Sequence, residues 1–340
     1  MASESSIATT ISPALNLGGR RILLTGGTGF VGRTLLDYVL ESCRIGNAPP
    51  ELWVLTRNPQ RFIEAYPRYR FLPFLHLHGA DLQDAAIDRS LKTLPDTFTD
   101  VIHAAADTHA SGSRLQWLDQ IVGGTRLMLD FAVKRGATRF LLTSSGAVYG
   151  AQPQDCEYLS ESAPYAPLTT AVAQVYGQSK RMAEHLCALY AEEFGLQAVM
   201  ARCFAFLGEH IPPLGPYAIG NFMHDALTAR QIIVKGDGTP LRSYLYGRDM
   251  AHWLFTLLER GAAGQCYNVG SDQAIALGDL ARLVASVLAP DTPVVIEGNA
   301  ALGQLRSRYI PDIGYAQTLG LRIETPLAEA IRQTADAWRP

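Results

Sequence analysis

The stretch Arg21-Ile22-Leu23-Leu24-Thr25-Gly26-Gly27-Thr28-Gly29-Phe30-Val31-Gly32 determines the fold that we expect for this chain. Its first five residues are an apolar run that predicts a strand, and residues 31–42 have the apolar spacing of a helix. Gly26, Gly29 and Gly32 lie where glycine permits a tight turn, a close approach to a pyrophosphate, and close packing of helix on strand. The helix amino terminus adds amide donors and a positive dipole end. The stretch therefore predicts a dinucleotide-binding turn, with contacts from Gly26, Gly29, Phe30, Val31 and Gly32.

Further apolar runs predict strands at 52–55, 101–106, 140–144 and 198–206, with helices at 115–134 and 182–194. Strands that alternate with helices are typical of a parallel sheet with crossover helices. We therefore expect an α/β fold, a Rossmann-type doubly wound parallel sheet with a smaller α/β substrate-binding domain. The predicted division is a flexible tail at 1–17, a dinucleotide-binding domain at 18–206 completed by part of 240–265, and a mainly substrate-binding domain at 207–340. The second domain would cap the carboxyl ends of the strands, where open α/β sheets bind ligands.

Composition narrows the class of protein. The chain has 340 residues and a net charge of −3, so nothing points to nucleic acid as a partner. No run of 18 apolar residues predicts a membrane span. The five cysteines are scattered and odd in number, which favours a reduced, cytoplasmic protein, and no cysteine or histidine spacing suggests a metal site.

The end of the second predicted strand bears on the choice of cofactor. NAD is usually held there by an Asp or Glu that binds the ribose 2′-hydroxyl. This chain has Arg57, with Arg61 nearby, and an arginine can pair with a 2′-phosphate. The residue favours NADP without excluding NAD, so the expected cofactor is NAD or NADP. Further expected cofactor contacts are Asp81 and Leu82 beside the adenine, and the small residues Ala104, Ala105 and Ala106 at a strand end.

Tyr176 and Lys180 are four residues apart, so on a helix they share one face. A free tyrosine has a pKa of about 10, which is too high for efficient acid–base work near neutrality. A neighbouring ammonium stabilises the tyrosinate, so we expect Lys180 to lower the pKa of Tyr176. Ser145, at the end of the run 140–144, can hydrogen-bond the same substrate oxygen. This pattern predicts a centre where a proton moves together with a hydride.

The chain resembles an extended short-chain dehydrogenase/reductase of the NAD-dependent sugar epimerase/dehydratase group, from about Arg20 to the C-terminus. The resemblance is carried by the stretches 26–32, 144–150, 176–180, 236–246 and 267–270. It implies Ser145, Tyr176 and Lys180 as catalytic residues and a nucleotide-diphosphate sugar as substrate. It also implies a homodimer paired through two helices per subunit, near 115–134 and 170–194.

The resemblance carries over less cleanly to the substrate side. Arg242 matches a family arginine that binds the substrate diphosphate, and its chemistry suits that role. Arg308 resembles a second such arginine, with Arg306 as a competitor, and Asn221 resembles a phosphate contact. Ala205 is a departure, because relatives commonly place a substrate-binding Asn there.

The two residues after Ser145 bear on the reaction. In the 4,6-dehydratases of this group they are an Asp and a Glu that eliminate water; here they are Gly146 and Ala147, which cannot transfer a proton. General acid–base steps contribute about 10²–10⁴-fold each. Oxidation and reduction at one carbon remain, either as C4 epimerisation or as net reduction of a keto-sugar. One feature favours dehydration instead: residues 105–109 resemble a dehydratase pattern, in which His109 would touch the sugar.

Four functions therefore stay open. A C4 epimerase is the leading prediction, followed by an NAD(P)H-dependent 4-keto reductase, which Arg57 favours. A sugar-nucleotide 4,6-dehydratase and a cofactor-binding protein without turnover are the remaining alternatives.

Overall fold

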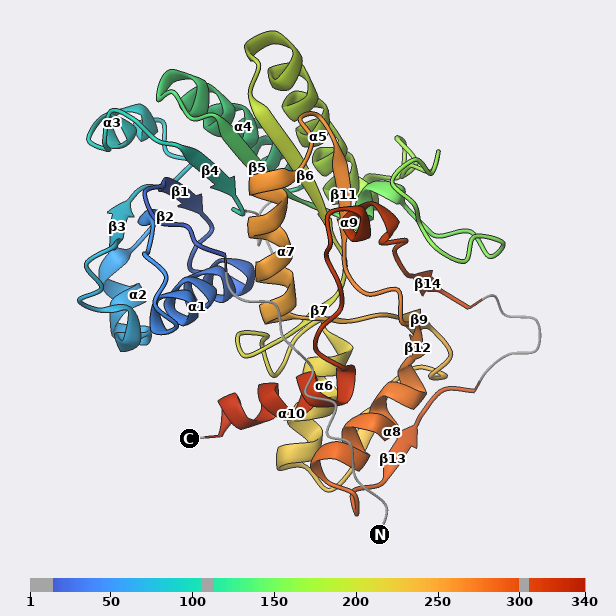
Figure 1. Cartoon of the computed structure of the whole chain (residues 1–340). Helices are drawn as coiled ribbons and strands as arrows, with labels where there is room; N and C mark the ends of the chain where they lie inside the picture. Colours follow the sequence, from blue (N-terminus) through green and yellow to red (C-terminus); the bar gives the residue numbers. More distant parts are fainter. Residues whose placement is uncertain (1–14, 106–112, 300–305, 340) are drawn as a thin grey trace.

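The computed structural model describes residues 15–105, 113–299 and 306–339. Within them, seven parallel strands form one sheet in the order β11-β6-β5-β4-β1-β2-β3 (Figure 1). Their bounds are β1 Arg21–Thr25, β2 Glu51–Thr56, β3 Leu75–Gly79, β4 Asp100–His103, β5 Arg139–Ser145, β6 Gln197–Cys203 and β11 Cys266–Val269. β1 pairs with β2 on one side and with β4 on the other, so the strand order reverses beside it. Open α/β sheets bind ligands at such a reversal, outside the carboxyl ends of the strands.

Helices cover both faces of the sheet. α1 (Phe30–Arg44) and α7 (Gly247–Arg260) pack on one face, and α4 (Arg114–Lys134) and α5 (Val175–Phe194) pack on the other. Successive side chains of a strand point to opposite faces. In β1, Ile22 and Leu24 accordingly enter the core under α1 and α7, whereas Leu23 enters the core under α4 and α5. Burial on both faces explains why this strand is an unbroken apolar run.

A smaller group of elements lies beyond the carboxyl ends of the strands (Figure 1). Its core is built by α6 (Ala218–Thr228), α8 (Leu277–Leu288) and α10 (Leu327–Trp338) around a two-stranded pair, β8 (Ile232–Val234) and β13 (Val294–Ile296). The short strands here are β7 Phe206–Leu207, β9 Leu241–Arg242, β10 Leu245–Tyr246, β12 Ile275–Ala276 and β14 Arg308–Tyr309. Elsewhere in the described chain, the remaining α-helices are α2 Pro59–Ala65, α3 Ile87–Lys92 and α9 Gly314–Thr318.

The α/β fold with a doubly wound parallel sheet is confirmed. Two predicted boundaries are wrong in an instructive way. α5 begins at Val175 instead of residue 182, so Tyr176 and Lys180 both lie on it, and the run 198–206 is divided between β6 and β7. The seventh strand of the sheet, β11, begins at Cys266, directly after the range 240–265 that we expected to complete the dinucleotide-binding domain. The division into domains stays a prediction; Leu17, at the end of the expected tail, is buried.

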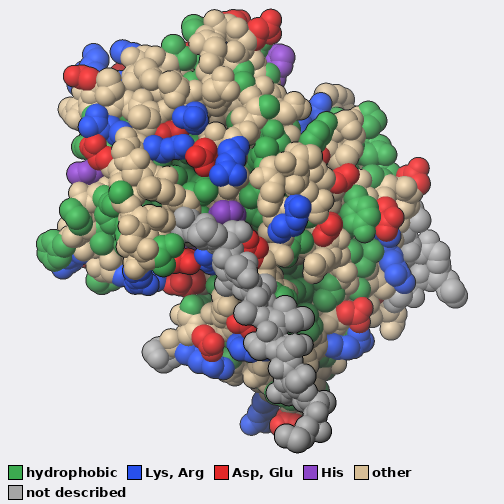
Figure 2. Space-filling model, in the orientation of Figure 1, with side chains coloured by type: hydrophobic (Ala, Val, Ile, Leu, Met, Phe, Trp, Pro, Cys, Tyr) green, Lys and Arg blue, Asp and Glu red, His purple; other side chains and the backbone are tan. Residues whose placement is uncertain are grey.

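The surface carries both signs of charge. On the face shown in Figure 2, Lys and Arg side chains are interspersed with Asp and Glu. Among the described residues, no helix is long and apolar enough to cross a bilayer.

Candidate active site

The glycine turn joins β1 to α1 and brings the backbone of two strands close together. Gly26 has φ +70, and a Cβ there would lie 2.5 Å from the carbonyl oxygen of Ala104. A Cβ on Gly32 would lie 2.3 Å from the carbonyl oxygen of Gly26. Real Cβ atoms do not approach this closely, so only glycine fits at both positions. Gly29 is the N-cap of α1, and Phe30 and Val31 follow it into the cavity described next.

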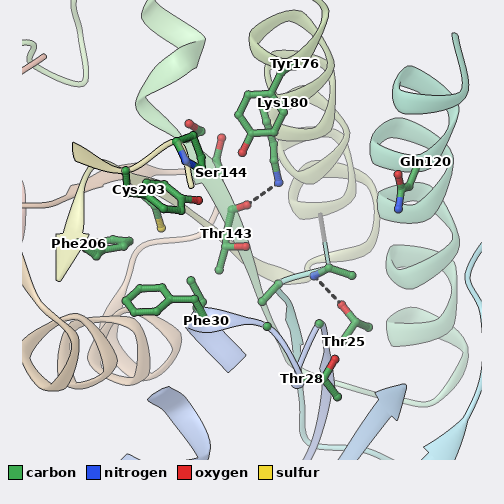
Figure 3. Close-up of a pocket in the computed structure, with 18 of the residues that line it drawn as sticks. Thr25, Thr28, Phe30, Gln120, Thr143, Ser144, Tyr176, Lys180, Cys203 and Phe206 are labelled. Atoms are coloured by element: carbon green, nitrogen blue, oxygen red, sulfur yellow. Dashed lines mark hydrogen bonds between the residues drawn. The ribbon is translucent and has the colours of Figure 1, made fainter. Parts of the chain in front are cut away.

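A cavity of about 930 Å³ lies at the carboxyl ends of the strands. Thr25 fixes its floor, because its hydroxyl contacts His103 Nδ1 at 2.8 Å and accepts the amide of Ala105 at 3.1 Å (Figure 3). The predicted cofactor contacts that line the cavity are Gly26, Gly29, Phe30, Val31, Arg57, Asp81, Leu82, Ala104, Ala105, Tyr176 and Lys180. Gly32 lies beneath the turn, and Ala106 falls outside the described residues. The cradle made by the glycines fits a dinucleotide, whose pyrophosphate would sit at the amino terminus of α1.

Tyr176 and Lys180 project from α5 into the same cavity, beside the end of β5 (Figure 3). Lys180 is 2 % exposed, and its Nζ donates a hydrogen bond to the carbonyl of Thr143 at 2.7 Å. The ammonium lies 6.0 Å from the centre of the Tyr176 ring. Burial lowers the pKa of Lys180 to about 8, against the opposing influence of Cys203 and Glu184.

The pKa that we expected for Tyr176 is wrong for this structure. Burial raises it to about 12, while the Ser145 hydroxyl lowers it and Cys203 and Tyr217 raise it further. The physical reason is that the phenol lies in an apolar wall, where loss of hydration disfavours the tyrosinate. Trp117 of α4 forms part of that wall, with ring centres 5.5 Å apart.

Ser145 ends β5, and its hydroxyl accepts the amide of Ala147 at 3.1 Å. Gly146, the residue after it, leaves no space for a side chain. A Cβ on Gly146 would lie 2.5 Å from the Tyr309 hydroxyl and 2.8 Å from the Phe204 ring. The rings of Phe204 and Tyr309 are themselves 4.6 Å apart. A Tyr–Phe pair therefore occupies the space over residue 146.

The predicted substrate contacts are distributed unevenly. Arg242 lines the cavity, and its guanidinium donates to the carbonyl of Leu241 at 2.8 Å. Arg308 and Asn221 are described by the structure, but neither is among the residues that line the cavity. Arg308 lies on β14 opposite Leu241, and the Asn221 amide is paired with the backbone of Gly215 at 2.9 and 3.1 Å. His109 lies outside the described residues.

Sequence reasoning missed several residues of the cavity. These are Trp117, Gln120, Cys203, Tyr217, Tyr244 and Tyr309. Two of them had a signal in the sequence, since Tyr244 lies in the stretch 236–246 that carries the resemblance and Tyr309 directly follows Arg308.

Beneath the centre, a buried ion pair ties α5 to β6. Arg202 Nη2 lies 2.8 Å from the Glu184 carboxylate, and Ser144 Oγ donates to the same carboxylate at 2.6 Å. Elsewhere, Asp37, Glu209 and His210 lie within reach of one another, but the Arg68 guanidinium pairs with Asp37 at 2.8 Å and with Glu209 at 2.5 Å. We interpret that group as a charge cluster joining the two parts of the chain.

The profile of the NAD dependent epimerase/dehydratase family matches residues 22–270 of this chain. The chain belongs to this family. It is similar to the dTDP-glucose 4,6-dehydratase of Neisseria meningitidis, with 28% identity over 81% of this chain and 78% of the relative. It is also similar to UDP-glucuronic acid decarboxylase 6 of Arabidopsis thaliana, with 28% identity over 100% of this chain and 98% of the relative.

Among solved structures, the UDP-glucose 4-epimerase of Thermotoga maritima, crystallised with UDP-glucose, has a similar fold. The TM-score is 0.78, with 22% identity over 94% of this chain and 98% of that one. Solved structures of similar fold hold NAD or NADPH. As a family member, the chain is an NAD(P)-dependent enzyme of the extended short-chain dehydrogenase/reductase type.

Proposed function

We propose that this enzyme acts on a nucleotide-diphosphate sugar and epimerises it at C4. The observation that carries the proposal is the wall beside Ser145, where Gly146 and Ala147 offer no acid or base and Tyr309 with Phe204 fills the space. Asp81 is the only carboxylate among the described residues that line the cavity. It follows β3, four strands from Ser145, or about 19 Å away at roughly 4.8 Å per strand. Asp81 therefore lies too far away to take a proton from C5.

The residues present suffice for proton transfer at one sugar hydroxyl. Tyr176, as the tyrosinate, would take the proton of the C4 hydroxyl during oxidation, and the resulting phenol would return a proton when the keto group is reduced. Ser145 would hold the same oxygen by a hydrogen bond. The Lys180 ammonium, which donates a hydrogen bond to the Thr143 carbonyl, would give the nicotinamide side of the cavity a positive potential. The bound nicotinamide ring supplies the hydride acceptor and donor. Inversion at C4 requires the keto-sugar to turn between the two transfers.

We infer that the nucleotide diphosphate binds at Arg242, the cationic side chain on the side of the cavity formed by β9. An arginine can form two parallel hydrogen bonds to a phosphate. Arg308 and Asn221 remain predictions as further phosphate contacts. The relatives named above act on dTDP-glucose and UDP-glucuronic acid, and the similar epimerase was solved with UDP-glucose, which supports this substrate class.

We infer that Arg57 gives a preference for NADP. It lines the cavity directly after β2, where NAD-selective sites place a carboxylate. Calorimetric titration of NAD and NADP into the wild type and Arg57→Ala tests this. The Arg57→Ala variant should lose affinity for NADP and keep its affinity for NAD. Tighter binding of NAD than of NADP by the wild type would refute the inference.

A 4-keto reductase is the second candidate, and Arg57 is the observation that favours it. Incubation of the purified enzyme with UDP-glucose, dTDP-glucose and their 4-keto derivatives separates the two functions. An epimerase inverts C4 with no net change in nicotinamide absorbance. Steady consumption of NADPH with a 4-keto sugar would establish the reductase and remove the epimerase.

We also propose that the enzyme is a homodimer paired through α4 and α5. Both helices expose apolar side chains: Leu115 and Leu118 on α4, and Met182, Leu189 and Phe194 on α5. All five cysteines are free, which suits a reducing cytoplasm.

A further inference from the structure

Tyr309 reaches the reaction centre from a part of the chain distant in sequence. It lies on β14, where parallel pairing with β9 places it opposite Arg242. Its hydroxyl lies over Gly146, 2.5 Å from where a Cβ would be, and its ring packs against Phe204. Two phenols, Tyr176 from α5 and Tyr309 from β14, therefore flank the end of β5.

Ser145 and both phenols line the cavity, and the Tyr309 hydroxyl lies over Gly146, the residue next to Ser145. Burial raises the pKa of Tyr176 and of Tyr309, and the Ser145 hydroxyl lowers the pKa of each. A serine hydroxyl accepts two hydrogen bonds and donates one. Since the Ala147 amide uses one acceptor site, a proton from Tyr309 would fill the other and leave the serine proton for Tyr176 or the substrate oxygen.

We propose that Tyr309 is a positioning residue for the reaction: its phenol orients the Ser145 hydroxyl toward Tyr176, so that three hydroxyls form one chain beside the substrate oxygen. The proposal rests on the proposed function, because it assigns Tyr309 to the same proton transfer. Gly146 is part of the device, since any side chain there would displace the Tyr309 hydroxyl. The glycine thus explains both the missing dehydratase acid and the room for a second phenol.

Several other groups face the two phenols and share in their titration. They are Lys180 and Trp117 beside Tyr176, Tyr217 and Cys203 near the cavity wall, and Arg242 beside Tyr309. Tyr309 also interacts with Tyr176 directly, through the charges of the two ionised phenols. Loss of that repulsion would lower the pKa of Tyr176, so a rise in this pKa after removal of the Tyr309 hydroxyl reports the chain through Ser145.

The decisive variant is Tyr309→Phe, which keeps the ring that packs on Phe204. Tyr315→Phe is the matched control, because Tyr315 is 46% exposed and lies outside the cavity. With UDP-glucose as probe, Tyr309→Phe should lower kcat about three- to tenfold, the range of one neutral hydrogen bond, with KM nearly unchanged. Loss of the donor chain destabilises the tyrosinate, so the acid limb of kcat/KM should move to higher pH. Tyr315→Phe should match the wild type.

A measurement without turnover supports the kinetics. NMR titration of isotope-labelled tyrosine, with the Tyr176 signal assigned by Tyr176→Phe, should show a higher pKa for Tyr176 in Tyr309→Phe than in the wild type. Gly146→Ala provides a second route, since its methyl group displaces the same hydroxyl. It should shift the Tyr176 pKa in the wild-type background and much less in Tyr309→Phe.

An unchanged Tyr176 pKa and pH profile in Tyr309→Phe would overturn the proposal. So would a loss confined to KM, which would make Tyr309 a simple substrate contact. These failures are distinct from failure of the proposed function, which would appear as full activity in Tyr176→Phe.

Discussion

At the scale of single residues, burial controls the chemistry of the centre more than the contact between Tyr176 and Lys180 does. It raises the pKa of the phenol to about 12 and lowers that of the ammonium to about 8. Both shifts have the same physical cause, because an apolar wall disfavours whichever form is charged. The separation of the two residues by one helical turn was predictable from the sequence, but the desolvation of Tyr176 was not, because it depends on Trp117 and on residues brought together only by the fold.

Burial predicts an unusual titration for Lys180. Its ammonium should lose the proton above pH about 8, because the apolar surroundings disfavour the charged form. NMR titration of isotope-labelled lysine, with the signal assigned by Lys180→Met, measures this pKa directly. Lys180→Met should also reduce kcat by about 10²-fold or more, the scale of one acid–base contribution. Lys134→Met, an exposed change at the end of α4, is the control and should keep the wild-type kcat. A Lys180 pKa well above 8 in the wild type would contradict this assignment.

The glycine turn gives a second prediction at this scale. In Gly32→Ala the new methyl group would lie 2.3 Å from the Gly26 carbonyl oxygen, so the turn must open and NAD(P) affinity should fall by at least tenfold. Gly236→Ala is the matched control, since a Cβ there meets nothing within 4 Å. Calorimetric titration of the cofactor measures both. Equal affinities in the two variants would show that close packing beneath the turn is unimportant for binding.

At the scale of elements, α5 carries Tyr176 and Lys180, and a buried ion pair fixes it to the sheet. The Glu184 and Arg202 side chains are 8% and 12% exposed, and they lie on α5 and β6. Removing one partner of a buried pair leaves an uncompensated charge and typically costs about 3–5 kcal/mol.

Arg202→Met should therefore lower the free energy of unfolding by about 3 kcal/mol or more. Arg282→Met breaks the exposed pair with Asp279, where the two side chains are 60% and 66% exposed, and should cost less than about 1 kcal/mol. Urea unfolding followed by circular dichroism compares the two. Similar losses in both variants would mean that the pair does not anchor α5.

The elements differ in how far the sequence predicts them. α4 is a long helix and β1 is an unbroken apolar run that ends at a glycine turn, and the structure places both within one residue of the expected bounds. β14 has two residues, and its role comes from pairing with β9, more than sixty residues earlier in the chain. No local pattern encodes such a pairing, so the place of Tyr309 in the centre emerges only from the tertiary structure. Arg308 and Asn221 were predicted from a motif resemblance, yet neither lines the cavity. A resemblance of this kind does not indicate which side chains point into the cavity.

At the scale of the whole molecule, the exposed apolar side chains of α4 and α5 predict the oligomeric state. Met182 is 50% and Leu189 is 36% exposed, and both lie on α5, which packs on the face of the sheet opposite α1 and α7. A double variant, Met182→Glu with Leu189→Glu, should place like charges at a twofold interface and yield a monomer. Ile45→Glu, at an apolar residue 59% exposed beyond α1, should leave the mass unchanged. Sedimentation equilibrium decides, and a wild-type monomer would refute the dimer.

The central claim is that the centre oxidises and reduces one carbon and eliminates nothing. The most direct measurement uses UDP-glucose deuterated at C4, with the product analysed by NMR. We predict UDP-galactose that retains deuterium at C4, because the hydride returns to the carbon it left. Deuterium at C6 of a 4-keto-6-deoxy sugar would show that water is eliminated and would contradict the account.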